Sequence, residues 1–168
     1  MNLSELNHGD VEKIIVSLLK CCGSSKWAKN IILARPFSSI DNLIDFSEKV
    51  WFELDKDDYL EAFAAHPKIG EKKPPEISIN TEKWTRKEQS GMTTATYQIR
   101  QELEKNNLTY EKKFGYIFII CATGKSGKEM LELLKIRIGN DPMSEIMIAA
   151  NEQNKITKLR LRKLLDYK

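Results

Sequence analysis

Apolar residues recur at the three- and four-residue spacing of amphipathic helices along most of the chain. The apolar positions over 10–22 form one helix face, and a second face over 26–34 ends before Arg35-Pro36. Turn-forming residues separate the helical runs, most densely over 71–81, where two prolines and several charges predict a loop. The same periodicity predicts further helices over 39–51, 55–66, 93–113, 126–139 and 142–165. The pattern therefore predicts an all-α fold, a bundle of about seven to eight helices.

The stretch 116–122 departs from this periodicity, because it is short, continuously apolar and rich in aromatic and β-branched residues. It is shorter than an ordinary helix, and no other part of the chain resembles a strand that could pair with it. The sequence predicts a buried extended segment. Its backbone N–H and C=O groups then need partners from side chains, neighbouring backbone or a polar ligand.

Several helix starts carry recognisable capping signals. Ser24-Ser25 can cap the helix over 26–34, and Ser39 can cap the helix that follows it. Thr85-Arg86-Lys87-Glu88 and Ser126-Gly127-Lys128-Glu129 both fit the capping box, with a hydroxyl at the N-cap and Glu three residues later. Asp141-Pro142 combines an N-cap residue with a proline at the first helical position. These signals predict that Glu88 serves at least as a helix-capping residue.

Composition and charge narrow the class of protein. The 168 residues fit one domain over 1–168, with 41% hydrophobic residues for a core and a net charge of only +3. Such mild charge argues against a nucleic-acid partner, and no apolar run reaches the ~18 residues of a membrane span. Three cysteines without paired spacing, and no apparent signal peptide, predict a reducing, cytoplasmic setting. The last residues do not match the Ser-Lys-Leu peroxisomal address.

Two further motifs do not support a function. Ala122-Thr123-Gly124-Lys125-Ser126 resembles half of a phosphate-binding loop, but Ile119 stands where that motif requires glycine. The basic residues of the tail share a row that excludes Arg160 and lack interleaved aromatic residues, so they indicate a solvated helix face. The chain has no zinc-ligand spacing and no HExxH motif, so no metal site is predicted.

The candidate chemistry centres on His66, which the following Pro67 places at a forced helix end. The last helix carbonyls favour the imidazolium there, although a histidine in this position is often only a cap. Arg160 shares a helix row with apolar residues and therefore needs an anion or carbonyl partner. With Glu88-Gln89, these groups supply a base, a carboxylate and a fixed cation, which suit proton transfer on a small, anionic, amide-rich molecule.

From Ser25 to its C-terminus, the chain resembles the 2-oxo-4-hydroxy-4-carboxy-5-ureidoimidazoline (OHCU) decarboxylases of urate degradation. The resemblance rests on five motifs in the family's order and spacing: Ala65-His66-Pro67-Lys68-Ile69-Gly70, Arg86-Lys87-Glu88-Gln89-Ser90-Gly91, Lys113-Phe114-Gly115-Tyr116-Ile117-Phe118, Asn140-Asp141-Pro142 and Lys155-Ile156-Thr157-Lys158-Leu159-Arg160-Leu161. The family usually carries serine at position 85, where Thr85 keeps the hydroxyl. It often carries Asp-Leu where Lys68-Ile69 stand.

The resemblance implies an all-helical, cofactor-free and commonly dimeric enzyme, hence a homodimer. The implied reaction is loss of CO2 from the OHCU carboxylate, followed by protonation to (S)-allantoin. His66 would be the acid/base and Pro67 would shape its turn, while Glu88 would hold the imidazole or a ring N–H. Gln89 would bind amide groups, and Arg160 would bind anionic or carbonyl oxygens. The ureido or ring edge would be bound by the backbone of Phe118, Ile119, Ile120, Cys121 and Ala122. The further implied substrate-binding residues are Thr85, Arg86 and Lys87.

Two alternatives remain open at this point. The chain could be a non-enzymatic helical module whose basic C-terminal face docks a partner, or an enzyme of the same scaffold that acts on another ureido acid. The decarboxylase interpretation requires that His66, Glu88-Gln89 and Arg160 line one pocket, although almost a hundred positions separate the first from the last.

Overall fold

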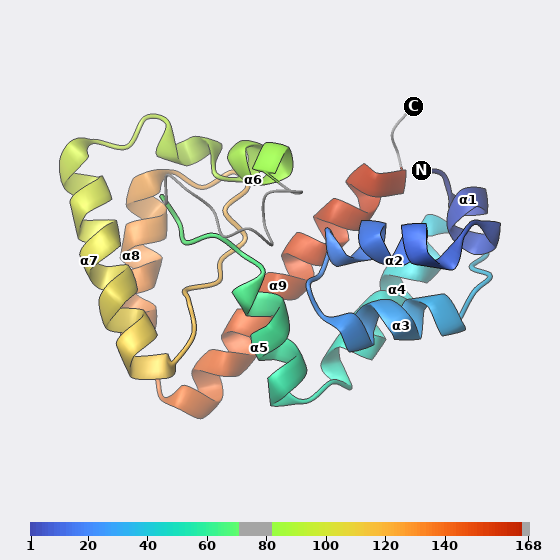
Figure 1. Ribbon diagram of the computed structural model, residues 1–168. Helices are drawn as coiled ribbons and strands as arrows, with labels where there is room; N and C mark the ends of the chain where they lie inside the picture. The colour runs from blue at the N-terminus through green and yellow to red at the C-terminus, as the bar shows by residue number, and fades with distance from the viewer. Residues whose placement is uncertain (71–81, 166–168) are drawn as a thin grey trace. The chain divides into compact units, whose positions relative to one another are not determined.

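The computed structural model describes residues 1–70 and 82–165, and all regular secondary structure in these residues is helical. The predicted all-α fold is therefore confirmed (Figure 1). No helix in the described part is both long and apolar enough to cross a membrane. The elements are α1 (Leu3–His8), α2 (Val11–Leu19), α3 (Ser25–Leu33), α4 (Ile40–Phe52), α5 (Lys56–Ala64), α6 (Glu82–Glu88), the 3-10 turn η2 (Ser90–Met92), α7 (Tyr97–Phe114), α8 (Gly127–Ile138) and α9 (Pro142–Leu165).

The chain divides into two compact units. The N-terminal unit contains residues 1–62 together with those from 153 onward, and the central unit contains residues 63–152. Helices α5 and α9 each contribute residues to both units. The units are described in turn below.

In the N-terminal unit, α3 packs against both α2 and α4. Ser24 caps α3 by accepting the Trp27 N–H, and Ser39 caps α4 in the same way, as the sequence predicts. Trp27 is fully buried, and its indole N–H is shared between the carbonyl and the hydroxyl of Ser47 at 3.3 and 3.2 Å. The large apolar body and satisfied polar tip of this tryptophan join α3 to α4.

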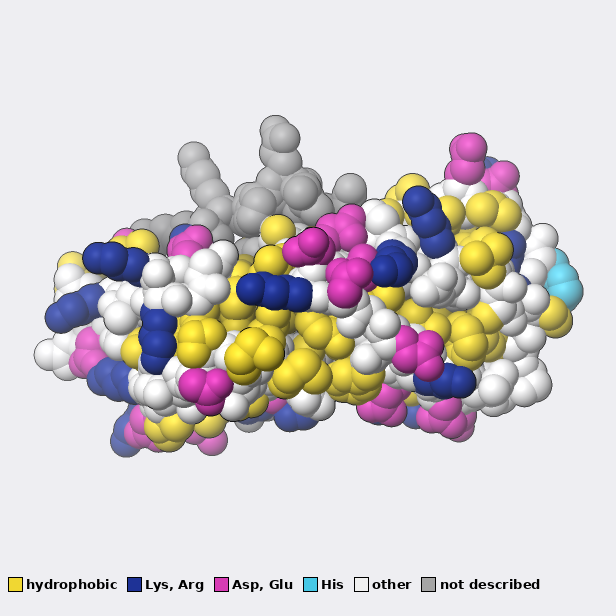
Figure 2. Space-filling model, turned by 90° about the horizontal axis from the view of Figure 1, so that it is seen from below, with side chains coloured by type: hydrophobic (Ala, Val, Ile, Leu, Met, Phe, Trp, Pro, Cys, Tyr) yellow, Lys and Arg dark blue, Asp and Glu magenta, His cyan; other side chains and the backbone are white. Residues whose placement is uncertain are grey.

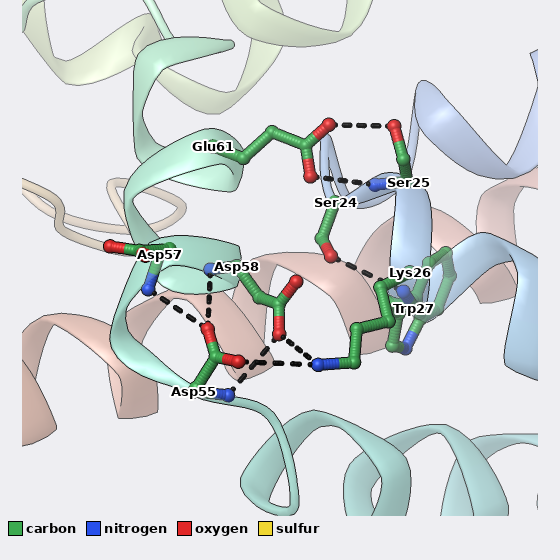
Figure 3. A network of polar contacts seen from close by, with 8 residues as sticks. All are labelled: Ser24, Ser25, Lys26, Trp27, Asp55, Asp57, Asp58 and Glu61. Atoms are coloured by element: carbon green, nitrogen blue, oxygen red, sulfur yellow. Dashed lines mark hydrogen bonds and ion pairs between the residues drawn. The ribbon is translucent and has the colours of Figure 1, made fainter.

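The start of α3 is also tied to α5 by a polar network (Figure 3). The Glu61 carboxylate accepts the backbone N–H of Ser25 at 3.0 Å and its hydroxyl at 2.6 Å. Lys26 donates to Asp55 at 3.2 Å and to Asp58 at 3.0 Å. A carboxylate at a helix N-terminus satisfies an unpaired N–H and complements the helix dipole, so Glu61 fixes α5 to the N-terminus of α3.

The basic row near the end of α9 is neutralised within the same unit. Lys158 pairs with Glu48 at 2.8 Å, and Arg162 pairs with Asp41 at 2.9 Å, both acids being on α4. On the face shown in Figure 2, Lys and Arg side chains are likewise scattered among acidic ones. The structure therefore offers little support for a basic docking face.

In the central unit, α7 packs along α8, and α7 ends at Gly115 as predicted. The predicted capping box at Ser126 is present in full, because the Ser126 hydroxyl accepts the Glu129 N–H and the Ser126 N–H donates to the Glu129 carboxylate. Lys113 at the end of α7 donates to the carbonyls of Ile138 and Asn140, each at 2.6 Å, and so covers the exposed C-terminal end of α8.

The stretch 116–122 is non-helical and largely buried, which confirms the predicted extended segment. Its Ile119 carbonyl accepts from Arg137 Nη1 at 2.7 Å. Arg137 in turn is paired with Glu145, which is completely buried. A buried ion pair between α8 and α9 therefore holds the middle of the extended segment.

Several helix boundaries differ from the predictions. α2 ends at Leu19 rather than 22, and α5 ends at Ala64, so His66 lies two residues beyond the helix. Thr85 lies inside α6 instead of capping it, because the helix already begins at Glu82. The long helix predicted from 93 begins at Tyr97, where Thr96 supplies the cap. α1 was not predicted, although Asn2 and Glu5 form a capping box there.

Candidate active site

His66 lies in the segment that follows α5 in the central unit. Its side chain is only 9% exposed, and its backbone N–H donates to the Phe63 carbonyl at 3.1 Å, which closes a turn beyond the helix. Pro67 is also buried. The proline disfavours helical geometry at the residue before it, so the imidazole is carried on a turn rather than on the helix itself.

The backbone after His66 is held by side chains from two other elements. Asn107 Nδ2 on α7 donates to the Ile69 carbonyl at 3.3 Å. The Gly70 N–H donates to Gln89 Oε1 at 3.1 Å, and Gly70 adopts φ = 80°, a left-handed conformation that favours glycine. The Gln89 contact brings the segment that bears His66 to the end of α6.

The end of α6 carries the predicted acid and amide. Glu88 is buried, whereas Arg86 and Lys87 are exposed. Thr85 stands three residues before Glu88 on the same helix face, and its buried hydroxyl has no hydrogen-bond partner among the described residues. A buried hydroxyl without a partner costs about 1–3 kcal/mol, so a polar ligand at this position would recover free energy.

The segment after α6 lies directly against the chain that follows the extended segment. A Cβ at Gly91 would lie 1.9 Å from the Lys125 carbonyl oxygen, so only glycine fits there. Burial raises the pKa of the Cys121 thiol, and the carboxylates of Glu152 and Glu88 add to the rise. The Glu88 charge therefore acts on the extended segment at Cys121.

The structure answers in part where the backbone groups of the extended segment find partners. The Cys121 N–H donates to Glu152 Oε2 at 2.8 Å, and the Cys121 carbonyl accepts from Lys125 Nζ at 2.8 Å. The Ile119 carbonyl is bound by Arg137. These three groups are therefore satisfied by protein side chains, and the expected backbone contacts with substrate are limited to the other groups of residues 118–122.

Sequence reasoning missed the buried cluster that supports this segment. Glu145 accepts from Arg137 Nε at 2.8 Å and Nη2 at 2.6 Å, from Asn140 Nδ2 at 2.7 Å, and from the Tyr110 hydroxyl. The Arg137 guanidinium lies over the Phe118 ring at 4.6 Å. The one sequence signal for this cluster was that Asn140 belongs to the motif Asn140-Asp141-Pro142.

Arg160 lies on α9 in the N-terminal unit. It is buried, and its Nη1 donates to the Lys20 carbonyl at 3.1 Å, which confirms the expected carbonyl partner. Burial raises the pKa of the neighbouring Cys22 thiol to about 12, and the Arg160 charge opposes that rise. Within the central unit, Gln89 contacts the segment after His66 through Gly70, and Gly91 lies against Lys125. The convergence of the His66 imidazole, Glu88 and Arg160 on one pocket stays a prediction.

Among residues 1–70 and 82–165, no group of three or more His, Cys, Asp or Glu side chains has an arrangement that could hold a metal ion. The described side chains around His66 offer one imidazole, one carboxylate, amides and a hydroxyl, which are proton-transfer and hydrogen-bonding groups.

Comparison with known proteins identifies the family. The family model described as OHCU decarboxylase matches residues 7–162. The chain belongs to the OHCU decarboxylase family. It is 29% identical over 168 residues to a 2-oxo-4-hydroxy-4-carboxy-5-ureidoimidazoline decarboxylase from Halalkalicoccus jeotgali, covering 98% of this chain and 92% of that protein. The predicted family is therefore confirmed.

A second relative is longer than this chain. The chain is 44% identical over 150 residues to the uric acid degradation bifunctional protein TTL of Arabidopsis thaliana, covering 88% of this chain and 46% of that protein. It thus spans about half the length of that bifunctional relative.

Two solved structures share the fold of this chain. A crystal structure of OHCU decarboxylase in the presence of (S)-allantoin superposes with a TM-score of 0.79 at 41% identity, covering 90% of this chain and 99% of that one. A crystal structure of (S)-allantoin synthase has a TM-score of 0.71 at 18% identity, covering 99% of this chain and 55% of that one, and shows the fold alone.

Proposed function

We propose that this chain decarboxylates OHCU to (S)-allantoin in urate degradation, with His66 as the acid/base. Membership of the OHCU decarboxylase family supports the reaction. The observation that carries the site is the hydrogen bond from Gly70 N–H to Gln89 Oε1, because it joins the His66 segment to the end of α6. The buried Glu88 stands on that same helix, as does the Thr85 hydroxyl, which is buried and unpartnered within residues 1–70 and 82–165.

In the proposed reaction, the bond between the ring carbon and the carboxylate breaks, and CO2 leaves without its bonding electron pair. The electron pair remains on the ring frame, where carbonyl and ureido groups delocalise it, so donors aimed at those groups lower the barrier. His66 removes the proton of the substrate hydroxyl and later returns a proton to the ring. A single proton donor on one face of the ring would give one enantiomer.

The remaining contacts follow from the donors and acceptors that the structure leaves available. Because Gln89 Oε1 is occupied by Gly70, its amide nitrogen is the group that would bind a substrate oxygen. The Thr85 hydroxyl would bind a ring or ureido group, as would the backbone of Ile120 in the extended segment. Arg160 would hold the carboxylate or a carbonyl with the planar fork of its guanidinium.

The test compares His66→Asn with His8→Asn, a matched control at the exposed end of α1. Each protein is mixed with freshly generated OHCU, and circular dichroism follows optically active allantoin. We expect His66→Asn to slow formation of the S enantiomer at least 100-fold, the usual worth of general acid–base catalysis, and His8→Asn to match the unsubstituted protein. Undiminished S product from His66→Asn would overturn the assignment of His66.

The same assay separates the alternatives. A binding module would leave only the spontaneous racemic product, and an enzyme for another ureido acid would accelerate that compound and not OHCU. The expected homodimer and cytoplasmic location stay predictions, and light scattering coupled to size exclusion tests the first of them.

A further inference from the structure

The segment 68–70 is anchored at three consecutive residues, and two of the three anchors lie one turn apart on α7. Lys68 Nζ pairs with Glu111 Oε2 at 2.6 Å, the Ile69 carbonyl accepts from Asn107 Nδ2, and the Gly70 N–H donates to Gln89. Asn107 and Glu111 are at positions i and i+4, so they share one face of the helix. This face of α7 therefore holds the backbone after His66 at two successive residues.

The anchors differ in their surroundings. Lys68 and Glu111 are 35% and 39% exposed, and a pair in such solvent contact contributes little to stability, about 0–1 kcal/mol. Asn107 is buried, and its partner is a backbone carbonyl rather than a mobile side chain. A hydrogen bond of this kind fixes the position of the main chain itself.

The Ile69 side chain is buried, but the backbone of the segment also borders an open pocket. A pocket of about 600 Å³ is lined by Lys68, Ile69 and Gly70 on one side and by α7 on the other, with Asn107 in its wall. Side chains next to empty space lose the contacts that would otherwise resist movement. The position of residues 68–70 therefore depends on the polar anchors more than a segment inside a packed core would.

We propose that Asn107 is a positioning residue for His66: its amide holds the Ile69 carbonyl, and through the turn at 66–69 it sets where the imidazole stands. This inference rests on the proposed function for its catalytic consequence, while the placement of the imidazole is a property of the protein alone. Misplacing a catalytic group by about 1 Å costs on the order of 100-fold in rate. Asn107 touches no reacting atom and acts only through the backbone.

The test uses Asn107→Asp and Asn107→Ala. Asp keeps the size of Asn but puts a carboxylate against the carbonyl, and Ala removes the side chain. The matched control is Asn106→Ala on the same helix, because Asn106 is less buried and donates only to the Glu102 carbonyl of its own helix. Thermal melts establish that each variant is folded at the assay temperature, and either Asn107 variant alone suffices if the other unfolds.

Two readouts are taken. In steady-state kinetics with OHCU, we expect kcat of the Asn107 variants to fall 10- to 100-fold while KM changes less than about threefold. In carbon–proton correlation NMR, the two histidine rings give separate signals, and we expect the His66 signal to move or broaden while His8 stays in place as an internal reference. Asn106→Ala should change neither.

The outcomes are distinguishable. If kcat stays within twofold and the His66 signal is unchanged in a folded Asn107 variant, the positioning role is overturned. If stability falls but kcat and the His66 signal do not change, Asn107 is merely structural, which also overturns it. If the unsubstituted protein does not act on OHCU, the proposed function fails, and the His66 signal alone then decides whether Asn107 positions the ring.

Discussion

The buried ion pair between Arg137 and Glu145 yields the sharpest prediction about stability. Glu145 is 0% exposed and accepts four hydrogen bonds, two of them from Arg137. Glu145→Gln nearly preserves the volume but removes the negative charge, and it turns one acceptor into a donor that faces other donors. The Arg137 guanidinium would then be a buried charge without its counter-ion.

Losing one partner of a buried pair costs about 3–5 kcal/mol, because the remaining charge is left desolvated. A surface ion pair that shares α8 with the buried pair provides the comparison. Lys135 on α8 pairs with Glu102 on α7, and both side chains are about half exposed, so Glu102→Gln should cost at most about 1 kcal/mol. The structure therefore predicts a difference of at least about 2 kcal/mol between two chemically identical substitutions.

Urea unfolding followed by circular dichroism measures this difference. With a slope of roughly 2 kcal/mol per molar urea, Glu145→Gln should lower the midpoint by about 1.5–2.5 M, and Glu102→Gln by no more than about 0.5 M. Replacing both members of the buried pair by apolar residues, Arg137→Met with Glu145→Leu, should restore part of the loss. Equal midpoints for Glu145→Gln and Glu102→Gln would show that the buried charge is not what makes this cluster important.

Three other predictions concern single positions. Gly91→Ala would place a methyl group against the Lys125 carbonyl, so we expect destabilisation of about 1–3 kcal/mol or more and loss of turnover, measured by thermal melting and the allantoin assay. Arg160→Lys loses the planar fork and should lower kcat/KM at least tenfold, whereas near-normal kcat/KM would assign Arg160 a structural role. Burial raises the pKa of the Cys22 thiol to about 12 in the folded protein, whereas the pKa of an unfolded cysteine is near 8.5. The buried neutral thiol therefore contributes fully to folding stability below about pH 8.5, and this contribution falls by about 1.4 kcal/mol per pH unit as the pH rises toward 12. Urea midpoints at pH 8 and 10 should therefore differ less in Cys22→Ala than in the unsubstituted protein, and equal differences would contradict this reasoning.

Local signals predicted local structure well. The caps at Ser24, Ser39 and Ser126 are as expected, because an N-cap depends on a side chain and a backbone N–H only two or three residues away. The extended segment 116–122 was also predictable, since its composition suits neither a short helix nor a loop.

The features that the sequence did not predict depend on ambiguous local patterns or on contacts between separate elements. Thr85 fits a capping box, but the same residues also continue a helix, and the local pattern does not decide between the two. The contacts of Arg137 with Glu145 and of Asn107 with Ile69 join separate elements, so no spacing in the sequence reveals them. The contacts that hold the candidate site in place were therefore not predictable from the sequence, and the roles of the site residues themselves stay predictions.

The anchoring of the His66 segment also explains how its sequence can vary next to the proposed acid/base. Members of the family that this chain resembles often carry Asp-Leu where Lys68-Ile69 stand. The contacts made by Asn107 and Gln89 are with the carbonyl of residue 69 and the N–H of residue 70, which every residue type except proline provides. The Lys68–Glu111 pair does depend on a side chain, but that pair is partly exposed and weak. Because the main chain rather than the side chains fixes the segment, positions 68 and 69 can differ while the turn that carries His66 stays in place.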